Sequence, residues 1–448
     1  MDIDNAPPLA HNSNSKRHAR RETPFYQLQP KLDPSLSPSL TSLRSQASLP
    51  YFTSPSHSQH RYRLGSEEGN NRPWLSLLIS SRSPKPEFLP VFIGKDVVAG
   101  IVELDLMKPE SIREVKITLQ GETTQLSQKP HVFLELSQTL ITQPSGKLSG
   151  KSSHPFSFIL PGDVTIDESN WAMVYPVPPK FHEKGILYID YKIVVTVRRR
   201  LLSVDNTSVL ASPVDPLHAS ISCSLTSNLV YIPETTAEHP SILRQRAYFN
   251  KSPLDPPILD PGGWKLLPPV EAVGTLVPNV TVIAHLSIAN PLTFALGTPI
   301  PLFLELRSSG AAHLDPELID VRLVRTVITR GVAGGIRSLD LARAVFWPAP
   351  GCSQSTKLWG EVIVGRRLTP SFNFSKCSVR YSIVLYPHSP EQIECQPLIS
   401  EEVSLTLRNA SGVVPRRQAP PGVTPPQIER QRAMPPRFFS LDFGIVRT

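Results

Sequence analysis

Two neighbouring stretches of strict alternation constrain the fold of this chain most strongly. In residues 98–106 the apolar or small side chains fall on one face, with Glu103 and Asp105 among those on the other. In residues 114–120 Val, Ile and Leu alternate with Glu, Lys, Thr and Gln. A period of two with one apolar face is typical of a half-buried antiparallel strand. Residues 107–111, which include Pro109, are expected to connect the two strands.

Two glycines in this region have conformational reasons to be there. Gly94 precedes the first strand, where a tight turn with positive φ favours glycine. Gly100 lies inside the strand, which indicates a bulge or a close approach of another backbone segment.

The same alternation continues through residues 73–233. Short strands are predicted at 74–79, 132–141, 154–160, 186–197, 217–225 and 228–232. They are separated by turns rich in Pro, Gly and Ser, and no long helical pattern lies between them. About seven short strands with such turns predict a β-sandwich.

A second β domain is predicted for residues 270–408. Its strands are expected at 280–288, 302–306, 319–323, 358–364, 379–385 and 403–407. The spacing of Gly297 from the apolar positions that follow it resembles that of Gly94 in the first domain. This faint internal repeat predicts an all-β chain of two tandem immunoglobulin-type sandwiches of related pattern.

The remaining segments have a different composition. Residues 1–72 and 409–448 are rich in Pro, Ser, Gln and Arg and lack a periodic apolar pattern, so disordered tails are expected. Residues 234–269 hold many of the 48 prolines and are expected to form a semi-rigid linker. Within this linker, residues 241–249 are predicted to form one short helix capped by Ser241.

The distribution of charge argues against a nucleic-acid-binding domain. The formal net charge is +8, but residues 1–72 carry 9 Lys and Arg against 6 Asp and Glu, and residues 409–448 carry 6 against 2. Residues 73–408 are nearly balanced, at 31 against 30. A nucleic-acid-binding surface would place its basic residues on the folded part, so no nucleic-acid partner is expected.

No metal, cofactor or catalytic site is predicted. Cys223, Cys352, Cys377 and Cys395 have no C-x-x-C spacing, and the 12 histidines are scattered singly. Hydrolase, metalloprotease and nucleotide-binding motifs are absent from the sequence. The glycines of residues 331–335 are expected at a hairpin tip. A non-enzymatic protein is the expectation, with an unrecognised hydrolase on a β scaffold as the remote alternative. No apolar run approaches the length of a membrane span, and no signal peptide is apparent, so a cytoplasmic location is expected.

Several ordered motifs resemble one known family. They are Gly94-x-x-Val97-x-x-Gly100-x-Val102-x-Leu104, Ile112-x-x-Val115-x-Ile117-x-Leu119-x-Gly121, the segment HPFSFILP at 154–161, and YPVPPKF at 175–181 followed by Gly185 and the strand 188–195. Together they resemble the N-terminal domain of the arrestin fold, and fungal α-arrestins (arrestin-related trafficking adaptors) are the most similar type. Lys180 stands where that pattern has Ser. The resemblance implies two arrestin-like sandwiches and covers about three quarters of the chain.

The resemblance also implies a function. Proteins of this family bind cytoplasmic segments of membrane proteins and link them to a WW-domain ubiquitin ligase through P-P-x-Y motifs. This chain has no P-P-x-Y; Thr23-Pro24-Phe25-Tyr26 keeps the P-x-Y half and is the candidate contact. Arg198, Arg199 and Arg200 end a predicted strand and would contact acidic lipid or phosphate, unless they form only a solvated strand end.

The implied role is therefore that of a trafficking adaptor. Such a protein acts in endocytosis, ubiquitin-linked sorting or signalling, with recruitment from the cytoplasm to the plasma membrane or endosomes and a peripheral membrane contact. The alternative is a retromer-like coat subunit, which shares the fold but holds a fixed place in an assembly.

Overall fold

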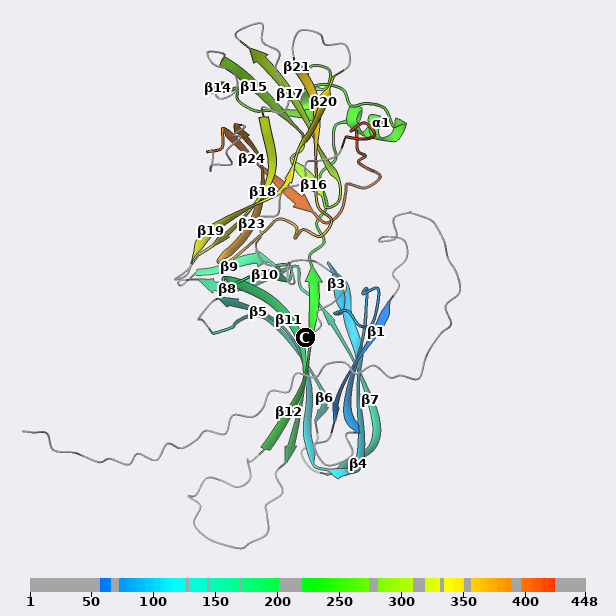
Figure 1. The fold of residues 1–448 in the computed structure, drawn as a ribbon. Coiled ribbons are helices and arrows are strands. Elements are labelled where there is room, and N and C mark those ends of the chain that lie inside the picture. Colours follow the sequence, from blue (N-terminus) through cyan, green and yellow to red (C-terminus); the bar gives the residue numbers. More distant parts are fainter. Residues whose placement is uncertain are drawn as a thin grey trace, which may run out of the picture.

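The computed structural model describes residues 57–65, 72–125, 129–142, 146–168, 171–200, 220–273, 281–308, 319–330, 334–349, 356–387 and 396–423. Over these residues the chain is almost entirely β-structure, with α1 (Ile242–Asn250) as its α-helix. The strands form two β-sandwiches that follow one another along the chain (Figure 1). The expected all-β fold of tandem sandwiches is confirmed.

The first sandwich pairs a four-stranded sheet with a six-stranded one. The smaller sheet has the order β1-β2-β4-β7; the larger has the order β3-β12-β11-β5-β6, with β10 added on β11, and β8 and β9 form a separate pair. The bounds are β1 Ser58–Gly65, β2 Pro73–Ser81, β3 Val91–Ile93, β4 Val97–Glu110, β5 Ile112–Gln125, β6 His131–Thr142, β7 Leu148–Ile159, β8 Asp163–Glu168, β9 Trp171–Pro176, β10 Phe181–Glu183, β11 Leu187–Arg200 and β12 Ser220–Ile232.

The second sandwich has two six-stranded sheets. One has the order β13-β15-β17-β21-β20 with β14 on β15, and the other has the order β16-β24-β23-β18-β19 with β22 on β23. The bounds are β13 Trp264–Leu266, β14 Val270–Val273, β15 Thr281–Ala289, β16 Thr293–Ala295, β17 Pro299–Ser308, β18 Ile319–Thr329, β19 Gly335–Arg343, β20 Val345–Pro348, β21 Thr356–Ile363, β22 Phe372–Phe374, β23 Cys377–Pro387 and β24 Ile399–Thr406.

The two sandwiches repeat one topology. In the first sandwich the three-residue strand β3 pairs in parallel with the last residues of β12. In the second, the three-residue strand β16 pairs in the same way with the last residues of β24. Gly94 follows β3 and Gly297 follows β16, and both have positive φ, at 57° and 81°. The internal repeat predicted from the spacing of these glycines is therefore present in the backbone.

The alternating side chains fill the cores as predicted. Val115, Ile117 and Leu119 of β5 are fully buried, as are Val98 and Val102 of β4. A Cβ added to Gly100 would lie only 2.0 Å from the carbonyl oxygen of Leu78 on β2, so the expected close backbone approach is also observed.

Several expected boundaries are wrong. Strand β4 continues through residues 107–110 to Glu110 with an irregular register against β7, so the connection to β5 is shorter than predicted. Order begins before residue 73, because β1 pairs with β2. Strand β13 belongs to the second sandwich, although it lies within the predicted linker. Local composition did not reveal these segments, because each becomes a strand by pairing with a neighbouring strand and not through a periodic pattern of its own.

The expected helix of the linker is confirmed. The Ser241 hydroxyl accepts a hydrogen bond from the Arg244 backbone N–H at 3.2 Å, which is an N-cap, and Lys251 ends α1 in a left-handed conformation. Arg244 is buried, stacks over Trp264 at 5.1 Å and donates to the carbonyl of Asn290 at 2.9 Å. These contacts fix α1 against the second sandwich.

Candidate partner-binding surfaces

Arg198 and Arg199 lie at one end of β11, but their side chains lie on opposite faces. Arg198 Nη1 donates to Glu114 Oε2 at 3.0 Å and is 57% exposed. Arg199 stacks over the Trp74 ring at 4.2 Å and forms an ion pair with Glu110 at 3.0 Å. Alternation along a strand produces this separation. Arg198 and Arg199 therefore do not form one basic patch; the Arg200 backbone pairs with Ser220.

The other predicted partner-binding residues, Thr23, Pro24, Phe25 and Tyr26, lie outside the described residues. Residues 178–181, Pro-Pro-Lys-Phe, are similar to a P-P-x-Y motif but end in Phe, and they are part of the fold. Pro178 and Pro179 are buried, Phe181 is 3% exposed, and the Pro178 carbonyl accepts a hydrogen bond from Tyr191. This Pro-Pro-Lys-Phe sequence is therefore not presented to a partner.

Each sandwich has a strand whose outer edge no other described strand pairs along most of its length. Strand β12 pairs with β11 over residues 220–229, while β3 covers only residues 230–232 on its other side. Strand β24 likewise meets β16 only over residues 404–406. Such an edge presents alternating N–H and C=O groups that another extended chain can bind by strand addition.

The edge of β12 is polar on its solvent face. Ser222, Ser224, Thr226 and Asn228 are exposed, whereas Leu225 and Leu229 point into the core. A polar face reduces indiscriminate association of an open edge and leaves the backbone groups to bind an extended peptide.

The opposite end of β11 carries a charged cluster centred on Asp190. Lys180 donates to Asp190 Oδ1 at 2.5 Å, and the His182 ring lies 2.7 Å from the same oxygen. Burial opposes ionisation of Asp190, but the His182 hydrogen bond and the Lys180 charge outweigh it and lower its pKa to about 2. Asp190 is therefore ionised and paired with Lys180 beside the β10–β11 turn.

The two sandwiches meet through an acidic group of the first and arginines of the second. Glu183 of β10 is 4% exposed, and its carboxylate accepts hydrogen bonds from Arg325 of β18 at 3.0 Å and Arg337 of β19 at 3.2 Å. Figure 1 shows β8, β9 and β10 next to the ends of β18 and β19. A buried carboxylate requires such partners, so these bonds orient the two domains.

Aromatic rings also pack across this domain boundary. Phe374 of β22 packs against Phe133 at 4.8 Å and Tyr175 at 5.7 Å, measured between ring centroids, and Phe372 packs against Phe181 at 5.4 Å. Ser375 donates to Glu168 across the same boundary. The domain boundary is therefore a packed contact and not only a covalent linker.

The sequence offered little signal for this interdomain site. Glu183 and Arg325 are 142 residues apart. Glu183 lies in the polar stretch HEK, and Arg325 lies inside an alternating strand, where a charged residue is typical of the solvent face. Only the docking of the two sandwiches brings them together.

The described residues contain no group of three His, Cys, Asp or Glu side chains placed to hold a metal ion. Two free thiols are present among them, and burial raises the pKa of Cys223 and raises that of Cys377 to about 12. No helix among the described residues is long and apolar enough to cross a membrane. A hollow of about 280 Å³ lies on the surface near Arg82, Asp96 and Val97.

Comparison of the sequence with protein-family models and with curated proteins finds no match.

Proposed function

We propose that this chain is a non-catalytic, arrestin-like adaptor that binds cytoplasmic segments of membrane proteins. The observation that carries the proposal is the repeated sandwich with an open polar edge on β12 in a chain that has the family-like motifs of residues 91–121, 154–161 and 175–195. Strand addition at such an edge recognises an extended peptide through its backbone, with side chains supplying selectivity.

The packed domain boundary supports the same role. Because Glu183 and the aromatic contacts hold the two sandwiches together, both open edges belong to one scaffold. An adaptor needs such a scaffold to present a bound segment to a second protein. Recruitment to the plasma membrane or endosomes, and of a ubiquitin ligase through residues 23–26, are further parts of the proposal.

The test is site-specific photo-crosslinking in cells with the full chain. A photoreactive residue replaces Ser224 or Thr226, which are exposed on β12, and a matched one replaces Lys251, which is exposed at the end of α1. We expect the β12 positions to capture integral membrane proteins through their cytoplasmic segments, while position 251 does not.

Equal capture at all three positions, or no membrane protein at positions 224 and 226, contradicts the proposed edge. A stable complex of fixed stoichiometry that co-purifies with the chain favours the retromer-like coat subunit instead. Loss of ligase components, but not of membrane cargo, after replacement of residues 23–26 by alanine would separate ligase recruitment from cargo binding.

A further inference from the structure

Residues 409–418 form a strap that lies against the outer side of the second sandwich; it makes a turn at residues 411–412 and has no helix or strand structure after it. The expectation that the chain is disordered from residue 409 onward is wrong for residues 409–423, which the structure describes. The strap begins where Arg408 pairs with Thr236 of the linker, and the Arg408 carbonyl accepts from the Ala237 N–H at 2.9 Å. It belongs to neither sheet of the sandwich.

The strap neutralises a buried carboxylate. Glu361 lies on β21, on the face opposite the core residues Leu358 and Val362, yet it is only 1% exposed. Arg417 Nε donates to its Oε1 at 2.7 Å, and the Gln418 backbone N–H donates to its Oε2 at 2.9 Å. A buried carboxylate is tolerated when both oxygens are paired in this way.

Three alternate residues of the strap, at positions 413, 415 and 417, contact the rest of the protein. Val413 is 9% exposed and Pro415 is half-buried. Arg417 is 50% exposed, but its Nε reaches Glu361. Val414, at 65% exposure, and Arg416 are also exposed, and they lie between these three contacts. An extended segment whose alternate side chains enter a groove is how grooves commonly recognise a peptide. The pattern is apolar-x-Pro-x-Arg.

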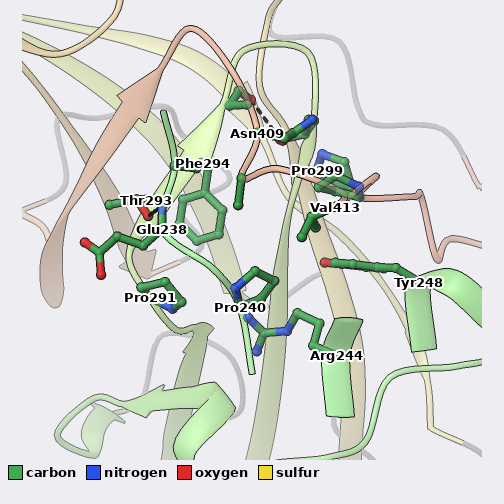
Figure 2. A pocket seen from close by; sticks show the side chains of 15 residues that line it. Glu238, Pro240, Arg244, Tyr248, Pro291, Thr293, Phe294, Pro299, Asn409 and Val413 are labelled. Atoms are coloured by element: carbon green, nitrogen blue, oxygen red, sulfur yellow. Dashed lines mark hydrogen bonds between the residues drawn. The ribbon is translucent and has the colours of Figure 1, made fainter. Parts of the chain in front are cut away.

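The groove is built by parts of the chain that are distant from the strap in sequence. Its walls come from the linker, α1 and the start of the second sandwich, with Pro240, Tyr248, Phe294 and Pro299 among the lining residues. Figure 2 shows Val413 beside Pro299 and the hydroxyl end of Tyr248. A cavity of about 30 Å³ remains there, so the strap does not fill the groove completely.

We propose that this groove is a second peptide-binding site, for extended segments of the form apolar-x-Pro-x-Arg on a partner protein, and that residues 413–417 occupy it in cis. Glu361 selects the arginine, and the apolar wall around Tyr248 and Pro299 holds the first two anchors. The sequence contains this pattern once more, at Ala433, Pro435 and Arg437, which lie outside the described residues. The proposal is independent of the adaptor function.

A cis occupant competes with a partner because its local concentration is of millimolar order. Weakening the strap without altering the groove should therefore expose the site. The double variant Val413→Ser, Arg417→Ala removes two anchors, and the matched control Val414→Ser, Arg416→Ala changes only the two exposed neighbours.

The experiment measures fluorescence anisotropy of a labelled synthetic peptide with the sequence of residues 409–420, added to the full chain. We expect the double variant to bind this peptide at least about tenfold more tightly than the control and the wild type. Addition of Glu361→Gln to the double variant should abolish the gain, and a peptide with Glu in place of the residue 417 arginine should not bind.

The wild-type chain provides a second measurement that depends on no substitution. Backbone hydrogen exchange at residues 409–418 should accelerate when unlabelled peptide is added in excess, because the strap is displaced. Equal binding by the double variant and its control, retention of binding with Glu361→Gln, or unchanged exchange in excess peptide would each overturn the proposal. Peptide-induced dimerisation would identify a second copy of this chain as the occupant and would overturn the assignment to a partner protein.

Discussion

The guanidinium of Arg325 and the carboxylate of Glu183, which belong to different sandwiches, meet at 3.0 Å at the domain boundary. Both side chains are shielded from solvent, at 12% and 4% exposure. Arg337 reaches the other oxygen of Glu183 but is 53% exposed. The boundary therefore has one well-buried ion pair, Glu183 with Arg325, and one largely exposed ion pair, Glu183 with Arg337. The two pairs should contribute different amounts to the free energy of unfolding.

Replacement of Glu183 by Ala should lower the free energy of unfolding by about 3 kcal/mol, because it leaves the buried Arg325 without its partner. Replacement of Arg337 by Ala is the matched control and should cost less than about 1 kcal/mol, because that pair is largely solvated. Urea unfolding followed by tryptophan fluorescence measures both. Equal losses would contradict the assignment of Arg325 as the main partner.

Two buried tyrosines, one in each sandwich, should contribute similar amounts to the free energy of unfolding. Tyr191 and Tyr381 are both fully buried, and their hydroxyls donate to the backbone carbonyls of Pro178 and Thr369. Each Tyr→Phe substitution removes one hydrogen bond and leaves a carbonyl without its partner, that of buried Pro178 or of half-buried Thr369, at a cost of about 1–2 kcal/mol. Urea unfolding of the two single variants measures this cost. If the free energy of unfolding falls in only one of the two variants, the two hydrogen bonds are not equivalent in energy although their geometry is similar.

Gly100 should not tolerate a side chain. An added Cβ would lie 2.0 Å from the Leu78 carbonyl oxygen and 2.9 Å from the Phe156 ring, so Gly100→Ala should destabilise the first sandwich by about 2–3 kcal/mol. Gly162→Ala is the control, because a Cβ there meets nothing within 4 Å, and its effect should stay within about 0.5 kcal/mol. Thermal unfolding distinguishes them, and a neutral Gly100→Ala would refute the close approach.

Stability should fall as the pH drops below about 6.5, through His60. This ring is 1% exposed, with Nε2 at 2.8 Å from Ser81 Oγ and Nδ1 at 3.1 Å from the Pro86 carbonyl. Burial lowers the pKa of His60, although the backbone carbonyls partly oppose this. As the pH falls, His60 binds a proton more readily in the unfolded chain than in the folded chain. The contribution of His60 to the free energy of unfolding is therefore present above pH 6.5 and is lost as the pH falls through the pKa of the folded state.

His60→Gln should therefore flatten the pH dependence of unfolding between about pH 7.5 and 5. His131→Gln, at an exposed position, should leave it unchanged. Urea titrations at several pH values check this, and an unaltered slope in His60→Gln would assign the acid sensitivity to another group.

The alternation of apolar residues predicted most core strands because a half-buried strand requires it locally. Residues 74–79 and 132–141 fall within strands of the structure, the predicted strand at 186–197 matches β11 except for its first residue, and Ser241 caps α1 as predicted. Strands β8 and β10 were not predicted, because three to six residues give too few repeats to reveal a period. The strap at 409–418 was missed because its order comes from contacts with Glu361 and the linker, and not from its own composition.

The sequence by itself determined the fold class, the number of sandwiches and the repeat that relates them, because side-chain periodicity and the glycine turns act over a few residues. Only the tertiary structure decided which charged groups become partners. Arg198 and Arg199 are adjacent in sequence but lie on opposite faces of β11, whereas Glu183 with Arg325, and Glu361 with Arg417, are brought together across long separations. Burial makes these distant pairs obligatory, since a carboxylate removed from water must find its donors wherever the fold places them.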